Sequence, residues 1–408
     1  MLGLRSEDAQ PLAGLAAAAK EEREKTRGAG HAVTLASAPA SGQAGPENRW
    51  PAGERLRQPG QMPFVRVHPD DADAVAAAVD ILEAARQVDD PGSPVREPEL
   101  FRRWLRHGWD LRPEEVHLYL PEGGAAPVGV LALDLPTRDN LHLVWAELTV
   151  RPDRRRQGHG TALMEELLRR TREAERTTVW VGGPADDPVV PAFLGRFGFR
   201  HASHDARRKQ WLREVDPAAI ARLRQQAETA AADYRLERLT PPLSDALLSE
   251  LAVVAESIND APMGDLSFEP EVFDHDLMRD IEAARIGRGD QLYRVVARHR
   301  ETGELGGHTV VVTTPLRPTR GSQGDTAVAR QHRGHRLGLL LKIEMMAWLA
   351  EVEPQLEEIE TWNQADNVHM ISVNEAIGYR LDRVFDMYEW QVAAAATAAR
   401  DVPALAEA

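Results

Sequence analysis

A run of basic residues and glycines after one apolar segment carries the clearest chemistry in the chain. Residues 148–163 read LTVRPDRRRQGHGTAL, so an apolar strand ending at Val150 leads through a basic turn into an amphipathic helix. Unpaired N–H groups and the dipole at such a helix N-terminus favour an anion. Gly158 and Gly160 have no Cβ to keep a phosphate away, and the arginines add charge-assisted hydrogen bonds. The pattern predicts a cradle for a diphosphate.

Two other phosphate-binding motifs do not fit this loop. A P-loop ends in Gly-Lys-Ser/Thr, which the segment lacks. The dinucleotide fingerprint needs a different glycine spacing and follows the first strand of its unit, whereas the strand here is the fourth.

The pattern R-x-x-G-x-G between a strand and a helix resembles motif A of the GNAT superfamily of N-acetyltransferases, with Arg155 at its first fixed position. Downstream, residues 192–199 read AFLGRFGF and resemble the family's motif B. The resemblance implies that the loop amides hold the pyrophosphate of acetyl-CoA and that the pantetheine arm lies along the strand. In this half it implies cofactor contacts at Leu148, Val150, Arg155, Arg156, Gln157, Gly158, His159, Gly160 and Thr161.

The second half of the chain carries another copy of this arrangement. Residues 325–338 read DTAVARQHRGHRLG, in which Arg333 and Gly338 match fixed positions and Arg336 stands where the first glycine is expected. Asn363 and Asn367 match asparagines that the family often places after its fifth strand. The resemblance implies cofactor contacts here at Val328, Arg333, Gly334, His335, Arg336, Leu337, Gly338, Asn363 and Asn367.

Candidates for proton transfer follow from the same resemblance. Glu147 lies on the strand beside the expected thioester, where the family often keeps a glutamate as general base, and Asp325 holds a comparable position. Each could equally be a solvent-facing carboxylate on an alternating strand. The family's tyrosine acid is replaced by Leu194 and Asn374, and an asparagine can hydrogen-bond without donating a proton. We expect the second half to be catalytic and the first to bind acetyl-CoA structurally.

Composition excludes several other classes of function. The net charge of −15 argues against nucleic acid as a general partner. With no cysteine, disulfides, thiolate metal sites and cysteine nucleophiles are excluded, and no His/Asp/Glu spacing indicates a metal. We find neither a transmembrane run nor a signal peptide, so we expect a cytoplasmic protein without a membrane partner.

The 408 residues suit two domains, and the element order repeats along the chain. Arg155 and Arg333 lie 178 residues apart, and Gly198 and Gly378 lie 180 apart, which indicates an internal duplication. We predict an α/β fold of two GNAT-like domains, each a mixed, mostly antiparallel sheet flanked by helices. The predicted parts are a disordered arm (1–61), a first domain (62–213), a helical linker (214–233), a second domain (234–392) and a flexible tail (393–408).

The resemblance implies direct acetyl transfer from acetyl-CoA to a primary amine, which we expect to belong to a small molecule. The acceptor could instead be a protein amine, or the chain could be a non-catalytic acyl-CoA-binding sensor or scaffold. We expect a homodimer or a monomer in which the two halves form an internal pseudo-dimer.

Overall fold

The computed structural model describes residues 63–122 and 126–392, so the arm predicted at 1–61 and the tail at 393–408 lie outside the described residues. The strands are β1 Phe64–Arg66, β2 Glu115–Tyr119, β3 Gly129–Asp134, β4 Leu143–Val150, β5 Thr178–Pro184, β6 Arg200–Trp211, β7 Tyr234–Leu239, β8 Gln291–His299, β9 Leu305–Thr313, β10 Arg320–Val328, β11 Glu358–Gln364 and β12 Tyr379–Gln391. The α-helices are α2 Ala72–Asp89, α3 Pro98–His107, α4 His159–Glu173, α5 Val189–Gly195, α6 Pro217–Ala230, α7 Asp245–Ala255, α8 His275–Arg288, α9 Leu337–Val352 and α10 Val368–Ala376. Short 3₁₀ turns are η1 Pro152–Arg154, η2 Leu212–Glu214, η3 Glu256–Asp260 and η4 Arg330–His332.

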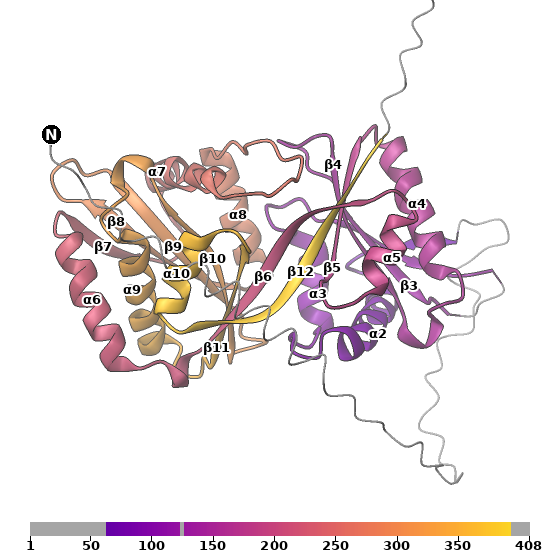
Figure 1. Cartoon of the computed structure of the whole chain (residues 1–408), viewed down its shortest axis with the longest axis horizontal. Helices are drawn as coiled ribbons and strands as arrows, with labels where there is room; N and C mark the ends of the chain where they lie inside the picture. The colour runs from indigo at the N-terminus through magenta and orange to yellow at the C-terminus, as the bar shows by residue number, and fades with distance from the viewer. Residues whose placement is uncertain (1–62, 123–125, 393–408) are drawn as a thin grey trace, which may run out of the picture. The chain divides into compact units, whose positions relative to one another are not determined.

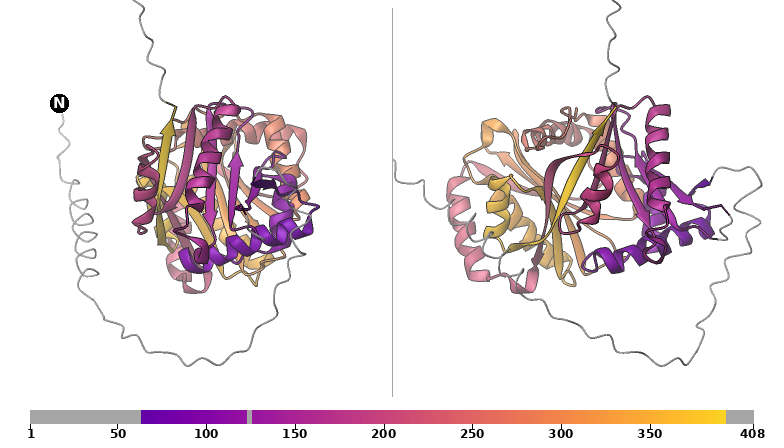
Figure 2. Two further views of the ribbon diagram at one scale, coloured as in Figure 1. Left: turned by 90° about the vertical axis from the view of Figure 1, so that its right-hand side faces the viewer. Right: turned by 45° about the vertical axis from the view of Figure 1, so that its right-hand side comes forward.

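The described strands form one sheet in the order β1-β2-β3-β4-β5-β12-β6-β11-β10-β9-β8-β7. Neighbours pair antiparallel except β4 with β5 and β10 with β11, which are parallel. Helices cover both faces (Figures 1 and 2). The predicted mixed, mostly antiparallel sheet with flanking helices is therefore observed, and its two parallel pairs stand at equivalent places in the two halves.

The last strands of the two halves are exchanged, a feature that the sequence analysis did not anticipate. Strand β12 pairs with β5 of the first half, and β6 pairs with β11 of the second half. Strands β6 and β12 also pair with each other and run side by side between the halves (Figure 1). Backbone hydrogen bonds thus join the two halves that the predicted linker at 214–233 separates in the sequence. Each half depends on the other for a complete sheet.

Apolar periodicity explains the packing of the first motif helix. Leu163, Met164 and Leu167 of α4 are fully buried, as their spacing predicted, because residues three and four apart share one helix face. Helix α9 differs because it is apolar around most of its surface, and it lies in the core between the sheet and α6. In the described part of the chain, no helix is both long and apolar enough to cross a membrane.

Candidate functional site

The parallel strands of each half separate after a few residues, and in the second half a cavity lies between them. Strands β10 and β11 pair only at residues 320–322 and 358–360. Beyond this point a cavity of about 1010 Å³ is lined by the rest of β10, the loop into α9, β11, α10 and the segment 257–262. Its volume is of the order of the larger small-molecule sites in proteins.

A β-bulge marks strand β10 at the mouth of this opening. The register with β9 shifts between Gln323 and Thr326, so that Gly324 and Asp325 face a single residue of β9. Gln323 Nε2 braces the bulge by donating to the carbonyl oxygen of Val310 at 2.6 Å. The equivalent pairing of β3 with β4 runs without a shift, so only the second half has this irregularity at this position.

The two glycine-containing loops have the same backbone conformation although their residues differ. Arg156 and Gly158 have left-handed φ values of 62° and 88°, and Gly334 and Arg336 have 88° and 54° at the equivalent positions. Glycine and arginine have therefore changed places between the loops. Arg336 adopts the conformation that glycine would supply, at a cost of about 1–2 kcal/mol, so the second loop keeps the shape of the first.

The first arginine of each motif is held by the protein itself. Arg155 Nε donates to the carbonyl oxygen of the last β4 residue at 3.1 Å, and its Nη1 donates to Asp89 at 2.7 Å. Arg333 Nε likewise donates to the last β10 residue at 3.1 Å, and its guanidinium also binds Asp260. In both halves this arginine closes the loop onto the strand.

Most of the residues predicted for the second half come together around the cavity. Those that line it are Asp325, Val328, Arg333, Gly334, Arg336, Leu337, Gly338, Asn363 and Asn367. His335 is not among them, since its Nδ1 lies 3.2 Å from the carbonyl oxygen of Ala230 in α6. Asn374 is fully buried behind the wall and donates its Nδ2 to Asn363 Oδ1 at 2.8 Å.

The residues predicted for the first half are more dispersed. Leu148 and Val150 pack against the core of their own half. Phe193 lies 3.5 Å from where a Cβ on Gly160 would be, and the ring of His159 packs on Tyr119. The remaining residues predicted there, from the loop and the start of α4, are exposed or half-buried: Arg156, Gln157, Gly158 and Thr161.

Comparison with known proteins agrees with this geometry. The family model described as Acetyltransferase (GNAT) family matches residues 77–199. The tandem GNAT protein from the clavulanic acid biosynthesis pathway superposes with a TM-score of 0.66 at 26% identity, covering 80% of this chain and 98% of that one. Residues 77–199 thus form a GNAT domain, and the chain is similar to a tandem GNAT protein over most of its length.

Other relatives of this GNAT protein match it less completely. Mycothiol acetyltransferases from Saccharomonospora viridis and Stackebrandtia nassauensis are 37% and 30% identical over 140 and 131 residues. These matches cover 34% and 32% of this chain but only 42% and 40% of the relatives, so the chain matches less than half of their length. A GCN5-related N-acetyltransferase from Sphaerobacter thermophilus has a TM-score of 0.56 at 16% identity, covering 81% of this chain and 96% of that one, which shows the shared fold.

Asp325 stands at the bulge of β10, and the charges of two arginines act on it. Its side chain is reached by solvent through the cavity, but the surrounding protein still weakens its hydration. Burial therefore raises the pKa of Asp325, while the charges of Arg294 and Arg285 act in the opposite direction. A carboxylate with a raised pKa is better suited to taking a proton near neutral pH.

Lys342 lines the same cavity, and the sequence analysis missed it. It is 2% exposed, and no acidic side chain in the described part of the chain pairs with it; its Nζ lies 5.6 Å from the centre of the Tyr379 ring. Burial lowers the pKa of Lys342 to about 7. The available signal was a lysine between Leu341 and Ile343 in a mostly apolar helix, since such a position does not suit a charge.

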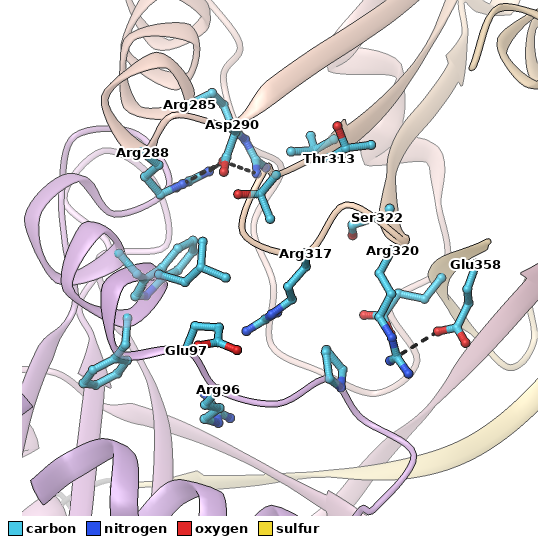
Figure 3. Close-up of a pocket in the computed structure, with 18 of the residues that line it drawn as sticks. Arg96, Glu97, Arg285, Arg288, Asp290, Thr313, Arg317, Arg320, Ser322 and Glu358 are labelled. Carbon is cyan, nitrogen blue, oxygen red and sulfur yellow. Dashed lines mark hydrogen bonds and ion pairs between the residues drawn. The ribbon is translucent and has the colours of Figure 1, made fainter. Parts of the chain in front are cut away.

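Glu147, the predicted base of the first half, lines a different and smaller pocket of about 430 Å³ (Figure 3). Its neighbour Glu114 accepts a hydrogen bond from Trp104 Nε1. Burial, with a smaller contribution from the charge of Glu147, raises the pKa of Glu114 to about 7. The pocket lies between the halves and also contains several arginines.

One group among the described residues has the composition of a metal site. His201, His204 and Asp386 bring possible ligand atoms within 4.8 Å of one another on β6 and β12. Both histidines are exposed, and His204 Nδ1 lies 2.7 Å from Asp386 Oδ1. This hydrogen bond accounts for the arrangement, and none of the three lines either pocket described above.

Proposed function

We propose that this GNAT protein is an acetyl-CoA-dependent N-acetyltransferase that holds the acyl donor in its second half and acetylates a primary amine of a small molecule. The observation that carries the proposal is the cavity of about 1010 Å³ between β10 and β11, together with the bulge in β10. The first half has the closer match to the motif but no equivalent bulge.

The residues around the cavity fit the parts of acetyl-CoA. The first turn of α9 offers unpaired N–H groups to the pyrophosphate, as helix N-termini do. A Cβ on Gly338 would have only the Thr326 methyl group within 4 Å, at 3.9 Å, so the loop leaves open space there. Because Asn374 engages the Oδ1 of Asn363, the amide N–H groups of Asn363 remain available to a pantetheine carbonyl.

Direct transfer requires one proton acceptor and one proton donor. The acceptor amine forms a C–N bond with the thioester carbonyl carbon, and the C–S bond breaks to release CoA. Asp325 takes the proton that the amine loses. Lys342, which lines the same cavity, returns a proton to the departing thiolate, because its pKa of about 7 leaves much of it protonated at neutral pH. This assignment gives Lys342 the role of the tyrosine that Asn374 replaces.

A small acceptor is supported by the size of the pocket in Figure 3, about 430 Å³, and by the partial match to mycothiol acetyltransferases. A protein amine would need a longer open groove. A non-catalytic acyl-CoA-binding protein would not need both Asp325 and Lys342 in the lining of the cavity.

Calorimetric titration of acetyl-CoA tests the proposal with a matched pair of variants, Gly338→Glu and Gly160→Glu. The two glycines hold equivalent helix positions, and at both a Cβ meets only ordinary contacts, so the new carboxylate and not strain is the perturbation. We expect Gly338→Glu to abolish binding and Gly160→Glu to retain it. The opposite pattern moves the acyl site to the first half. No binding to the unaltered protein removes the proposal.

A further inference from the structure

The pocket of Figure 3 adjoins the acyl cavity at the point where β10 and β11 separate. Residues 320–322 of β10 line the pocket, and residues 323–328 line the cavity. On β11, Glu358 and Glu360 belong to the pocket, whereas the next residues, 361–363, belong to the cavity. A molecule in this pocket therefore lies next to the acyl site.

Two polar groups of one tight turn lie on the wall of this pocket without partners. The turn connects β9 to β10, and its Arg317 N–H donates to the Thr314 carbonyl oxygen at 2.9 Å. Thr314 Oγ1 and Arg317 Nε are both buried, and neither has a hydrogen-bond partner in the described part of the chain. Figure 3 shows Arg317 extending from this turn into the pocket. Leaving buried polar groups without partners costs free energy, which a polar ligand group placed beside this turn would offset.

Arg320 and Arg288, which also line the pocket, are already paired: Arg320 lies 3.4 Å from Glu358, and Arg288 lies 2.9 Å from Asp290. Arg96 has no ion pair among the described residues, but its side chain is exposed. Arg317 has no acidic group within ion-pair distance among the described residues, and Glu97 and Glu360 act on it only through space. It is thus a half-buried guanidinium that is available to an incoming anion.

A carboxylate without a hydrogen-bond or ion-pair partner also lines the pocket. Glu360 faces Ser322 at the last position where β11 pairs with β10, next to the residues that line the cavity, and no hydrogen bond or ion pair engages it within the residues that the structure describes. Glu358, two residues earlier, is bound by Lys209 and Arg320. Helix α3 contributes an apolar wall of Leu100, Phe101 and Trp104.

We propose that this pocket binds an acceptor that carries a carboxylate beside its amine, namely an amino acid with an apolar side chain. Arg317 and Thr314 bind the carboxylate, and Glu360 holds the amine next to the acyl site. Arginine suits this task because its planar fork matches a carboxylate. The inference rests on the proposed function, since it names the acceptor of that same site.

The test compares three acceptors that differ in one group: L-phenylalanine, L-phenylalaninamide and 2-phenylethylamine. Full-length protein is assayed by CoA release, and binding of each compound to the CoA-saturated protein is measured by calorimetry. We expect L-phenylalanine to be favoured at least 10-fold in kcat/KM and in affinity. Arg317→Gln should raise its KM about 10- to 100-fold with little change in kcat, and leave 2-phenylethylamine unaffected.

Arg213→Gln is the matched control, because Arg213 is 79% exposed and pairs only with Glu357 at the surface. Thr314→Val provides a second variant that keeps the volume of the side chain. Equal use of all three acceptors, equal effects of Arg317→Gln on them, or no calorimetric binding of L-phenylalanine overturns the inference. Absence of acetyl-CoA binding overturns the proposed function instead. In that case, calorimetry of L-phenylalanine with the free protein still tests whether the pocket binds an amino acid.

Discussion

Replacing Lys342 by methionine should make the protein more stable, by an amount that depends on pH. Lys342 is buried with no ion pair in the described chain, and burial lowers its pKa from 10.5 to about 7. This change corresponds to a cost on the order of 5 kcal/mol for keeping the ammonium inside the folded protein, as an upper estimate. Methionine has a similar length and no charge, so it removes this cost while filling the space.

The sign of the pH dependence follows from proton binding. Below pH 7 Lys342 is protonated in both the folded and unfolded states, so the full cost is present. Between about pH 7 and 10.5 the unfolded state binds more protons than the folded state, so the cost declines as the pH rises. The advantage of Lys342→Met should therefore be largest at pH 6 and roughly 3 kcal/mol smaller at pH 9.

Urea unfolding of both proteins at pH 6, 7, 8 and 9, without acetyl-CoA, measures this difference. Lys209→Met is the control, because Lys209 is equally buried but donates to Gly92 at 2.9 Å and lies near Glu358 and Asp382. Removing a partnered buried charge should cost about 3–5 kcal/mol. A loss of stability in Lys342→Met at pH 6, or a gain that does not change with pH, refutes the reasoning.

Three further predictions concern the second half and the strand that completes the first. Asp325→Asn should lower kcat about 100-fold or more while acetyl-CoA affinity by calorimetry stays the same; a change of less than twofold excludes Asp325 from proton transfer. Gly334→Ala should cost about 1–2 kcal/mol in urea because its φ is 88°, whereas Gly338→Ala in the α9 helix should be neutral or stabilising; equal effects contradict the loop geometry. Burial raises the pKa of Glu389, but hydrogen bonds from Ser267 and Trp180 and the charge of Arg200 lower it below 4.5 overall. Glu389→Gln should thus cost about 2–3 kcal/mol at pH 7, and less as the pH falls below 4.5; a cost that grows on acidification, in urea unfolding, argues against this.

Local sequence patterns predicted the elements well where one face of an element is apolar. The apolar strand predicted to end at Val150 is β4, which ends at that residue, and the amphipathic helix predicted after the basic turn is α4. The partners of β6 and β12 could not be predicted in this way. Alternation shows that a segment is a strand, but it does not identify the neighbouring strand in the sheet. Both halves end in such a strand, and only tertiary packing determines that β6 pairs with β11 and β12 with β5.

The site shows the same limit. The glycine loops were located because a strand, a turn and a helix follow one another along the sequence. Arg336 stands where the motif expects its first glycine, yet it takes the left-handed conformation that Gly158 takes in the first loop. The second left-handed position, held by an arginine in the first loop, is held by Gly334 in the second. Gln323, Lys342 and Glu360 were missed because their importance depends on a bulge, a cavity and a pocket that no local spacing encodes.

The half with the poorer motif thus has the better-formed site, and the strand exchange suggests why both halves are retained. The first half matches the family model, but its loop arginine binds Asp89 and its strand β4 continues without a bulge. The second half has the bulge and the cavity, but its sheet is completed by β6, and helix α3 of the first half forms one wall of the adjoining pocket. A second half expressed alone would lack both. Under the proposed function, the first half would act in catalysis through its structure, because it completes the sheet of the second half and forms one wall of the proposed acceptor pocket. Its own loop would then not need to bind acetyl-CoA.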